Sequence, residues 1–280
     1  MKIADHIISK CVRSNMRAGE SEEGYWRRHW QEMLYRFDRD KAPFEEVDAW
    51  ERDCDREMAR AYQVLFDGVK GKTVLEMGCG GGHISALLAA DARHVTLVDV
   101  VPEALEYARR TASHLNVTDK MTFIEANIFD TKFESHDICY NCGVLEHFED
   151  AQAVEILCRM ARFARQMAAV TVPNLLSPEL IYKMARYGKG SERYMTPKSV
   201  IQLIRQGGLQ PLRHEVVNHW TPSVFGARLA DVARRTNFVR IFWRLGWLFT
   251  CTFRKSDDLG SEQTLESTAS KHASRCEGKF

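Results

Sequence analysis

A cluster of glycines directly after a short apolar run is the part of the sequence best suited to chemistry. The run Val74–Met77 leads into Gly78, Gly80, Gly81 and Gly82. Glycines let the backbone turn sharply and approach a ligand closely, where any Cβ atom would collide. We therefore expect a strand that ends in a loop built around a small molecule.

An acidic residue follows this cluster at the spacing of a nucleotide-binding site. Asp99 stands 21 residues after Gly78, at the end of a second apolar run. A carboxylate there can accept hydrogen bonds from both hydroxyls of a ribose. The fingerprint of nicotinamide dinucleotide sites also requires glycine at the sixth position of G-x-G-x-x-G, and this position is His83. The loop therefore departs from a dehydrogenase pattern.

Alternating strands and helices must position these residues. Apolar runs predict seven strands, at Thr73–Met77, Val95–Asp99, Met121–Glu125, Asp137–Asn141, Ala168–Val172, Pro211–Val217 and Trp247–Phe253. Helices are predicted between them at 83–90, 102–115, 150–165 and 197–206. This alternation predicts an α/β fold, with a Rossmann-like, mostly parallel seven-stranded sheet and helices on both faces.

Segments outside this core are predicted to be helical or disordered. Residues 1–70 carry no strand pattern, and their aromatic residues recur every three or four positions, so we expect a helical cap. The main domain then spans 71–255, with insertions at 174–196 and, in helical form, at 222–244. The tail 256–280 is rich in Ser, Glu and Lys and is expected to be disordered.

Five segments in order resemble the class I methyltransferases that use S-adenosyl-L-methionine. Residues 76–82 resemble the first motif of that family, E-x-G-x-G-x-G. Residues 123–128, 171–174 and 196–209 resemble later family segments, and 141–148 contains the GVLEHF stretch common in members that act on small molecules. The resemblance covers roughly residues 70–255 and implies methyl transfer from this cofactor.

The resemblance also implies which residues bind the cofactor. They are Glu76, Gly78, Cys79, Gly80, Asp99, Val100, Asn127, Ile128 and Asn141. The glycine loop with Cys79 would line the methionine moiety, Glu76 would hold the loop or the amino group, and Asn141 would lie near the ammonium. Asp99 would bind the ribose, while Val100, Asn127 and Ile128 would contact adenine. Many members have Asp at the position of Asn127, where an amide can still reach the adenine edge.

Methyl transfer from a sulfonium requires mostly positioning, with removal of a proton from the acceptor where needed. His147 follows the fourth predicted strand and is the candidate base, because imidazole titrates near pH ~6.5; a role in shaping the pocket is the alternative. His29 in the cap is a further candidate. No metal is expected, because Gly143 stands three residues before Glu146, where metal-binding relatives carry a ligand.

The methyl acceptor is expected to be a small molecule, with oxygen as the methylated atom and nitrogen or carbon as alternatives. Tyr25, Trp26 and His29 could form a lid over it, or belong to ordinary helix packing. Nucleic acid is not expected, because the loop after the fourth strand lacks the Asp/Asn-Pro-Pro-aromatic sequence that stacks on a flipped base. A non-catalytic protein that binds the cofactor is kept as an alternative.

Charge is distributed unevenly around a net charge of +1. Between Lys183 and Lys255 there are 14 Lys and Arg against 3 Asp and Glu. This favours an anionic acceptor or surface, or reflects solvated helix faces. Residues 238–245 interleave aromatics with arginines, which suits peripheral membrane contact or a lipid-like acceptor such as a quinone precursor; core packing is the alternative.

Cysteine usage and the N-terminus point to a reducing compartment. The eight cysteines are irregularly spaced, no secretory signal is evident, and no run reaches about 18 apolar residues. We expect a reduced, cytoplasmic protein without a membrane span. The oligomeric state stays open.

Overall fold

The structure is a computed structural model that describes residues 20–40, 49–177, 180–181, 193–217 and 248–256. The predicted insertion 222–244, the stretch 238–245 and nearly all of the predicted tail lie outside these residues, as does much of the basic C-terminal third. Within the described ranges, no helix combines the length and apolar character needed to cross a membrane.

The described strands form one seven-stranded sheet in the order β3-β2-β1-β4-β5-β7-β6. They are β1 (Thr73–Met77), β2 (His94–Asp99), β3 (Met121–Glu125), β4 (His136–Cys142), β5 (Ala164–Pro173), β6 (Leu209–Val217) and β7 (Leu248–Lys255). Neighbouring strands pair in parallel, except that β7 runs antiparallel to both β5 and β6. The predicted mostly parallel, seven-stranded sheet is confirmed.

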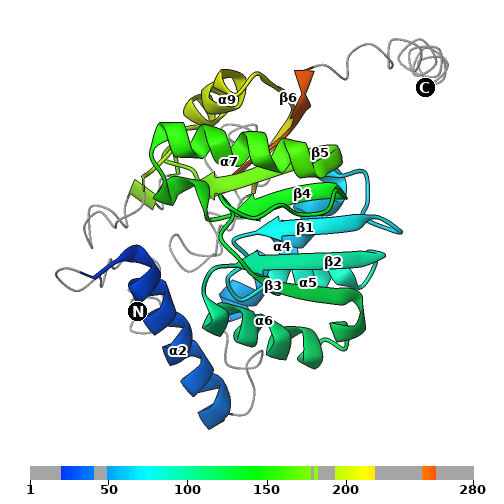
Figure 1. Ribbon diagram of the computed structural model, residues 1–280, viewed down its shortest axis with the longest axis vertical. Coiled ribbons are helices and arrows are strands. Elements are labelled where there is room, and N and C mark those ends of the chain that lie inside the picture. Colours follow the sequence, from blue (N-terminus) through cyan, green and yellow to red (C-terminus); the bar gives the residue numbers. More distant parts are fainter. Residues whose placement is uncertain (1–19, 41–48, 178–179, 182–192, 218–247, 257–280) are drawn as a thin grey trace, which may run out of the picture.

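Helices cover both faces of this sheet (Figure 1). They are α2 (Glu22–Asp40), α4 (Ala49–Leu65), α5 (His83–Ala89), α6 (Pro102–His114), α7 (Asp150–Phe163) and α9 (Pro197–Gln206), with short 3-10 turns η1 (Thr118–Lys120) and η2 (Leu145–His147). Alternate side chains of a strand point to opposite faces. Val74 accordingly packs with α4, α5 and α6, whereas Leu75 and Met77 pack with α7 and α9.

Helix α2 lies against α6 at one end of the sheet (Figure 1). Tyr107 of α6, almost fully buried, contacts two aromatic rings of α2: the ring centroids are 5.4 Å from Trp30 and 5.8 Å from Phe37. These aromatic contacts use the apolar stripe that the sequence predicted for the cap. Residues far apart in the chain are thereby joined, and α2 is held beside α6.

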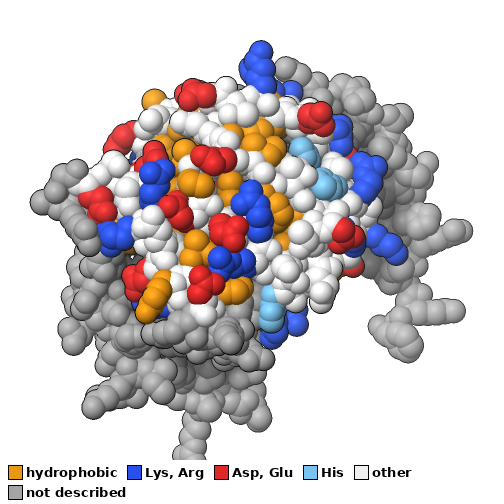
Figure 2. Space-filling view, turned by 60° about the horizontal axis from the view of Figure 1, so that its bottom comes forward, with side chains coloured by type: hydrophobic (Ala, Val, Ile, Leu, Met, Phe, Trp, Pro, Cys, Tyr) orange, Lys and Arg blue, Asp and Glu red, His pale blue; other side chains and the backbone are white. Residues whose placement is uncertain are grey.

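Ion pairs surround this aromatic contact on the surface. Arg27 of α2 lies 3.6 Å from Glu103 of α6, and Gln31 donates a hydrogen bond of 2.8 Å to the same carboxylate. On the face shown in Figure 2, acidic and basic side chains are interspersed rather than gathered by sign. Exposed pairs of this kind contribute little individually to stability. We therefore attribute the docking of α2 mainly to its aromatic residues.

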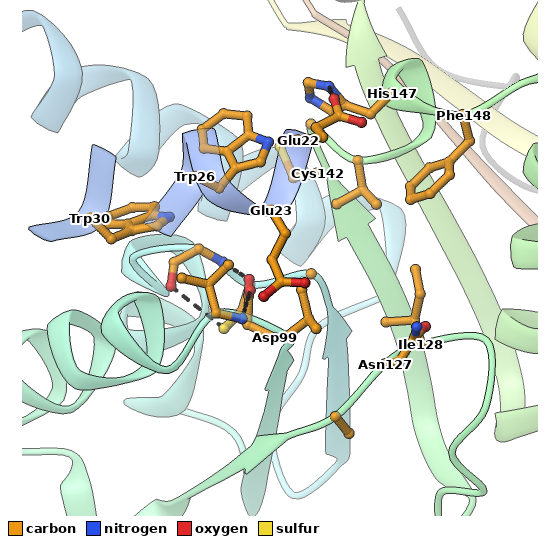
Figure 3. Close-up of a pocket in the computed structure, with 18 of the residues that line it drawn as sticks. Glu22, Glu23, Trp26, Trp30, Asp99, Asn127, Ile128, Cys142, His147 and Phe148 are labelled. Carbon is orange, nitrogen blue, oxygen red and sulfur yellow. Dashed lines mark hydrogen bonds and ion pairs between the residues drawn. The ribbon is translucent and has the colours of Figure 1, made fainter. Parts of the chain in front are cut away.

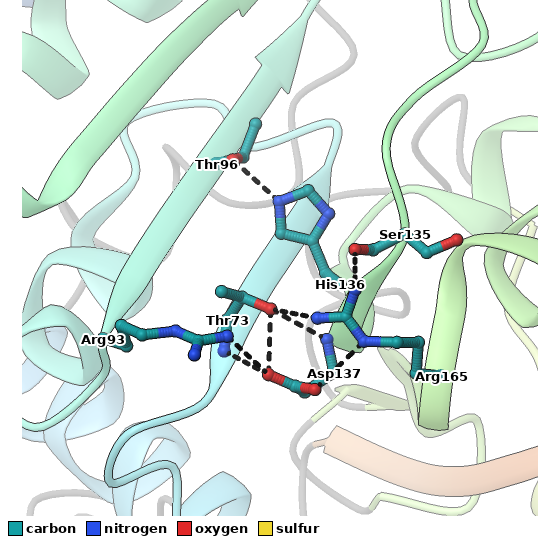
Figure 4. Close-up of polar contacts among 7 residues, drawn as sticks. All are labelled: Thr73, Arg93, Thr96, Ser135, His136, Asp137 and Arg165. Atoms are coloured by element: carbon teal, nitrogen blue, oxygen red, sulfur yellow. Dashed lines mark hydrogen bonds and ion pairs between the residues drawn. The ribbon is translucent and has the colours of Figure 1, made fainter.

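A polar cluster joins the amino-terminal ends of β1, β4 and β5 (Figure 4). Asp137 accepts hydrogen bonds from the Thr73 backbone N–H (2.7 Å), the Thr73 hydroxyl (2.9 Å) and the Arg165 guanidinium (3.1 Å). Burial disfavours ionisation of Asp137, but these donors and the positive charge of Arg165 outweigh it and lower its pKa to about 2. The cluster fixes three strands at the edge opposite to the glycine loop.

The start of β5 differs from the prediction. The strand begins at Ala164, four residues before the predicted start at Ala168, and α7 ends at Phe163 rather than 165. Arg165 and Gln166 are exposed and polar, so an apolar run does not reveal them as part of a strand. Pairing of Ala164 with His136 of β4 extends the strand through this segment.

Candidate active site

A cavity of about 510 Å³ lies at the carboxyl-terminal ends of β1, β2, β3 and β4 (Figure 3). Ligands of open α/β sheets bind at this edge, and small-molecule sites typically measure about 300–1,000 Å³. The lining consists of loop residues that follow these strands and of residues on α2: Gly78 to Gly81, Asp99 to Val101, Ala126 to Phe129, Cys142 to Val144, His147, Phe148, Glu22, Glu23, Trp26 and Trp30.

Gly78 begins the loop after β1 with a left-handed backbone, at φ 78°. Its N–H donates a hydrogen bond of 2.8 Å to the carbonyl of Val98 at the end of β2. A Cβ atom at this position would lie 2.6 Å from Cγ2 of Val144 in the loop after β4. Only glycine therefore lets these two loops meet at the cavity.

Gly80 links the loop both to Asp99 and to α2, which we call the lid helix because it carries the residues predicted to form a lid. Its N–H donates a hydrogen bond of 2.9 Å to Oδ2 of Asp99. A Cβ atom on Gly80 would lie 2.9 Å from Cζ2 of Trp30, so the loop is in close contact with α2. The glycines thus bring the loop backbone close to neighbouring side chains, and the predicted close approach to a ligand stays a prediction.

Asp99 ends β2 with its carboxylate at the cavity. Besides the bond from Gly80, Oδ1 accepts a hydrogen bond of 2.9 Å from the Val101 N–H. Burial raises the pKa of Asp99, and these backbone donors partly offset the rise. Each carboxylate oxygen has a second lone-pair position. Asp99 can therefore still accept hydrogen bonds from a ligand.

Glu76 lies behind the glycine loop, two residues before Gly78, and its side chain is only 3% exposed. Burial raises its pKa to about 8, despite hydrogen bonds from the hydroxyls of Ser85 and Tyr140. Its Oε2 atom has no hydrogen-bond partner among the described residues. A buried carboxylate with an unsatisfied oxygen requires an explanation, and a cationic ligand nearby would provide one.

The loop after β3 forms another wall of the cavity. The Asn127 side chain accepts a hydrogen bond of 2.9 Å from the Phe129 N–H. Arg159 of α7 donates a hydrogen bond of 2.6 Å to the carbonyl of Ile128. Val100, which is 43% exposed, also lines the cavity. This wall offers apolar surface and an amide to a flat ring.

His147 lies in η2, across the cavity from the glycine loop (Figure 3). Its Nδ1 atom is 2.8 Å from Oε1 of Glu22, the first residue of α2. The Trp26 ring meets the imidazole edge to face, with centroids 5.5 Å apart and planes at 89°. The imidazole is thus held by two residues of the lid helix.

The charge of the described lining is negative. Glu22, Glu23 and Asp99 contribute carboxylates, and the lining residues include no Lys or Arg. A cavity with one sign of charge and apolar walls attracts ligands of the opposite sign. Among the described residues, no group of three or more His, Cys, Asp or Glu side chains could hold a metal ion. The cavity therefore suits a ligand with a positively charged group.

The structure brings most of the predicted site residues together and places others away from the cavity. Those at the cavity are Gly78, Cys79, Gly80, Asp99, Val100, Asn127, Ile128, His147 and Trp26. Asn141 is fully buried and its Nδ2 atom is 3.3 Å from Sδ of Met160, so it does not line the cavity. Tyr25 and His29 stack on one another on α2 with centroids 6.5 Å apart, and neither lines the cavity.

Several lining residues were not anticipated from the sequence. Phe129 and Phe148 contact one another edge to face across two loops, with ring centroids 5.3 Å apart. Cys142 lies at the end of β4, and Glu22 and Glu23 begin α2. Phe148 lies within the segment 141–148 and Phe129 directly follows the segment 123–128, both of which resemble methyltransferase segments. This proximity could have identified the two phenylalanines as lining residues. No spacing in the sequence connects Glu22 with His147.

A family model supplies the decisive comparison. Residues 74–167 match a family described as a methyltransferase domain. This part of the chain is similar to a methyltransferase domain. The glycine loop, Asp99, the loop after β3 and His147 all lie within the matched residues, so the cavity is built mainly by this region, and α2 contributes further lining residues.

Sequence relatives of this domain are named ubiquinone biosynthesis O-methyltransferase. The protein of that name from Vibrio campbellii is 38% identical over 95 residues, which are 33% of this chain and 40% of the relative. The one from Vibrio atlanticus is 28% identical over 159 residues, or 52% of this chain and 66% of the relative. The chain thus matches less than two thirds of the length of these relatives.

Solved structures of methyltransferases share the fold. The magnesium protoporphyrin IX methyltransferase of Synechocystis, solved with bound S-adenosylmethionine, superposes with a TM-score of 0.56 at 14% identity, covering 84% of this chain and 98% of that one. The N-methyltransferase NodS of Bradyrhizobium japonicum gives 0.53 at 16% identity, covering 81% and 98%. At such identities the likeness shows the fold.

Proposed function

We propose that the protein transfers a methyl group from S-adenosyl-L-methionine to an oxygen atom of a small aromatic molecule. The cavity at the carboxyl ends of β1, β2, β3 and β4 carries this proposal, because a glycine cradle, a strand-end carboxylate and an acidic lining meet in it. The match of residues 74–167 to a methyltransferase domain supports the same activity.

The cavity fits this cofactor in charge and shape. S-adenosyl-L-methionine would supply a methyl group on a positively charged sulfonium, which is already activated for displacement. Asp99 would accept hydrogen bonds from the ribose hydroxyls. Asn127 and Ile128 would lie along the adenine ring, with Val100 on its other side. The backbone of Gly78, Cys79 and Gly80 would lie along the methionine portion, with the buried carboxylate of Glu76 behind it.

The protein's own contribution is positioning, exclusion of water and removal of one proton. Trp26 and Trp30 of α2 line the cavity and would limit access of water to a bound ligand. His147 would remove the proton from the acceptor hydroxyl as the oxygen attacks. A base positioned in this way typically accelerates a reaction about 10²- to 10⁴-fold. The His29 alternative has less support, because that side chain does not line the cavity.

The lining favours an uncharged aromatic acceptor. Trp26, Phe129, Phe148 and Cys142 provide apolar and aromatic surface, and the described lining offers no Lys or Arg to an anion. Sequence relatives are named O-methyltransferases of ubiquinone biosynthesis, which agrees with oxygen as the methylated atom. We therefore propose a phenolic hydroxyl, such as that of a quinone precursor, rather than a strongly anionic group.

Cofactor binding is tested by native mass spectrometry and isothermal titration with S-adenosylhomocysteine, with NAD as the competing nucleotide. We expect one adenosyl ligand per chain, and a loss of affinity of at least about tenfold in Asp99→Ala, because hydrogen bonds to a charged group contribute about 1.5–3 kcal/mol. Asp119→Ala in the exposed turn η1 is the matched control. Binding of NAD alone would contradict the proposal.

The acceptor is tested by methyl transfer to a panel of catechols, simple phenols and aromatic amines of similar size. We expect labelled methyl from S-adenosylmethionine on phenolic oxygen. Transfer to the amines alone would replace the oxygen acceptor with nitrogen, and absence of transfer to every member, with the cofactor bound, would contradict an aromatic acceptor.

A further inference from the structure

We propose that Glu22 is a positioning residue for His147, so that helix α2 completes the base when it lies over the cavity. The inference rests on the proposed function and assigns a second task to the lid. The two residues come from elements 125 positions apart in the sequence, and one hydrogen bond of 2.8 Å joins them.

The contact lies in an environment where such a bond is effective. The His147 side chain is only 9% exposed, whereas that of Glu22 is 40% exposed. The carboxylate is thus in contact with solvent on one side and with a nearly buried imidazole on the other. An ordered, charged hydrogen bond to a shielded ring orients that ring more strongly than an exposed pair would.

One face of α2 makes both contacts with the ring. Residues four positions apart lie on the same side of a helix. Glu22 therefore binds Nδ1 while Trp26, one turn later, packs edge to face against the same imidazole. Farther along, Trp30 contacts the glycine loop and Tyr107. The register of α2 therefore links the base, the cofactor loop and α6.

The bond to Glu22 also selects the form of the imidazole. A carboxylate accepts hydrogen bonds, so Nδ1 must carry the proton. The neutral ring then has its lone pair on Nε2, which is the nitrogen able to take a proton from an acceptor. When the acceptor oxygen forms its bond to the methyl carbon, its proton passes to Nε2 and the electron pair of the broken C–S bond remains on sulfur. Glu22 exchanges no proton and stabilises the resulting imidazolium.

This arrangement couples lid closure to chemistry. Moving α2 away from the cavity would remove the carboxylate from His147 and admit water at the same time. The base would thus be fully oriented only when the cavity is covered. Such coupling limits proton transfer to the closed state, in which the acceptor and the cofactor are both held.

The first test measures the imidazole of His147 directly by long-range ¹H–¹⁵N NMR, with the signal assigned from a His147→Gln variant. We expect the wild-type ring to carry its proton on Nδ1 and to titrate at a higher pH than in Glu22→Gln, because the carboxylate stabilises the charged ring. Glu32→Gln is the matched control, since Glu32 lies on the same helix and pairs with Arg36 on the surface.

The other acidic groups around His147 are unchanged in the wild type, Glu22→Gln and Glu32→Gln. They are Glu23 and Asp99 at the cavity, Glu146 beside it in η2, and Glu149 and Asp150 at the start of α7. A difference confined to Glu22→Gln therefore reports the Glu22 contact. Identical tautomer and titration in wild type and Glu22→Gln would overturn the proposal.

The second test separates rate from binding. We expect Glu22→Gln to lower kcat about 10- to 100-fold, by analogy with the loss when a residue that orients a metal-bound histidine is removed. KM for the cofactor should change less than threefold, and Glu32→Gln should match wild type. A loss confined to KM would overturn the positioning role. Absence of turnover in the wild type would contradict the proposed function, while the NMR result would still decide the contact.

Discussion

Gly78 has a left-handed backbone and packs so closely against Val144 that an added Cβ atom would collide with it. We expect Gly78→Ala to lower the affinity for S-adenosylhomocysteine at least about tenfold, because its Cβ atom must displace Val144 and shift the loop. Gly68→Ala is the matched control: Gly68 has φ 76°, and an added Cβ meets nothing within 4 Å. Both variants should lose about 1–2 kcal/mol of stability from backbone strain. Calorimetric titration checks the affinities, and equal affinities would show that the collision is harmless.

Glu76 is a second residue whose chemistry is set by its surroundings. Its pKa is about 8 in the folded chain, against about 4.3 when unfolded, so between these values the folded state binds the extra proton. The free energy of unfolding of the ligand-free protein should therefore fall as the pH rises from about 4 to 8 through this group. We expect Glu76→Gln to reduce this slope, because the amide has no proton to lose.

Urea unfolding at pH 6 and pH 8 measures that slope. Glu134→Gln, in the segment before β4, serves as the control. An unchanged slope in Glu76→Gln would mean that Glu76 is ionised in the folded protein.

At the scale of one element, aromatic contacts rather than ion pairs should hold α2. We expect Phe37→Ala to increase hydrogen exchange of backbone amides in Glu22–Asp40, because it removes a ring packed on Tyr107. Glu103→Gln removes the partner of Arg27 and should have a much smaller effect, since exposed pairs contribute about 0–1 kcal/mol. Exchange measured by mass spectrometry on both variants decides between the two; the reverse order would assign the docking to charge.

The polar cluster at the amino ends of the strands is an element-scale clamp on β1, β4 and β5. We expect Asp137→Asn to lower the free energy of unfolding at pH 7 by about 2 kcal/mol, as for hydrogen bonds to a charged group. Because the folded pKa of Asp137, about 2, lies below the unfolded value of about 3.9, this contribution is complete above pH ~4 and is lost as the pH falls toward 2.

Chemical denaturation of Asp137→Asn and wild type at pH 7 and pH 3 checks this dependence. Asp119→Asn, on the surface, should change stability by less than about 0.5 kcal/mol. A difference between Asp137→Asn and wild type that stays constant with pH would show that the charge of Asp137 is not involved.

At the scale of the whole molecule, the cavity joins two regions that are distant in sequence. A ligand in it should protect both α2 and the loop 126–129 from hydrogen exchange, and at 100 times its Kd it should stabilise the fold by about 2.7 kcal/mol. Exchange and thermal melts with and without S-adenosylhomocysteine measure the two effects. Protection of the loop alone would mean that α2 does not close on the ligand.

The sequence predicted the sheet far better than the closure of the site. Strand cores such as Val74–Met77 are mostly apolar, and the cluster of glycines after this strand marks a turn. The local sequence pattern was therefore sufficient to predict these strands and the loop. The start of β5 at Ala164 escaped because pairing with β4, rather than hydrophobicity, defines it. Glu22 escaped because its contact with His147 depends on how α2 docks, which is a tertiary property. Tyr25 and Trp26 are adjacent in sequence, yet only Trp26 lines the cavity.

The position of β7 has a consequence for the newly made chain. This strand comes last along the described chain but lies between β5 and β6, which precede it. Until Leu248–Lys255 has left the ribosome, β6 has no strand in the sheet to pair with, and the edge of β5 that β7 occupies remains open to other strands. Translation that stops before this segment would therefore leave a nearly complete sheet with an unpaired edge strand. We expect such a truncated chain to be prone to aggregation.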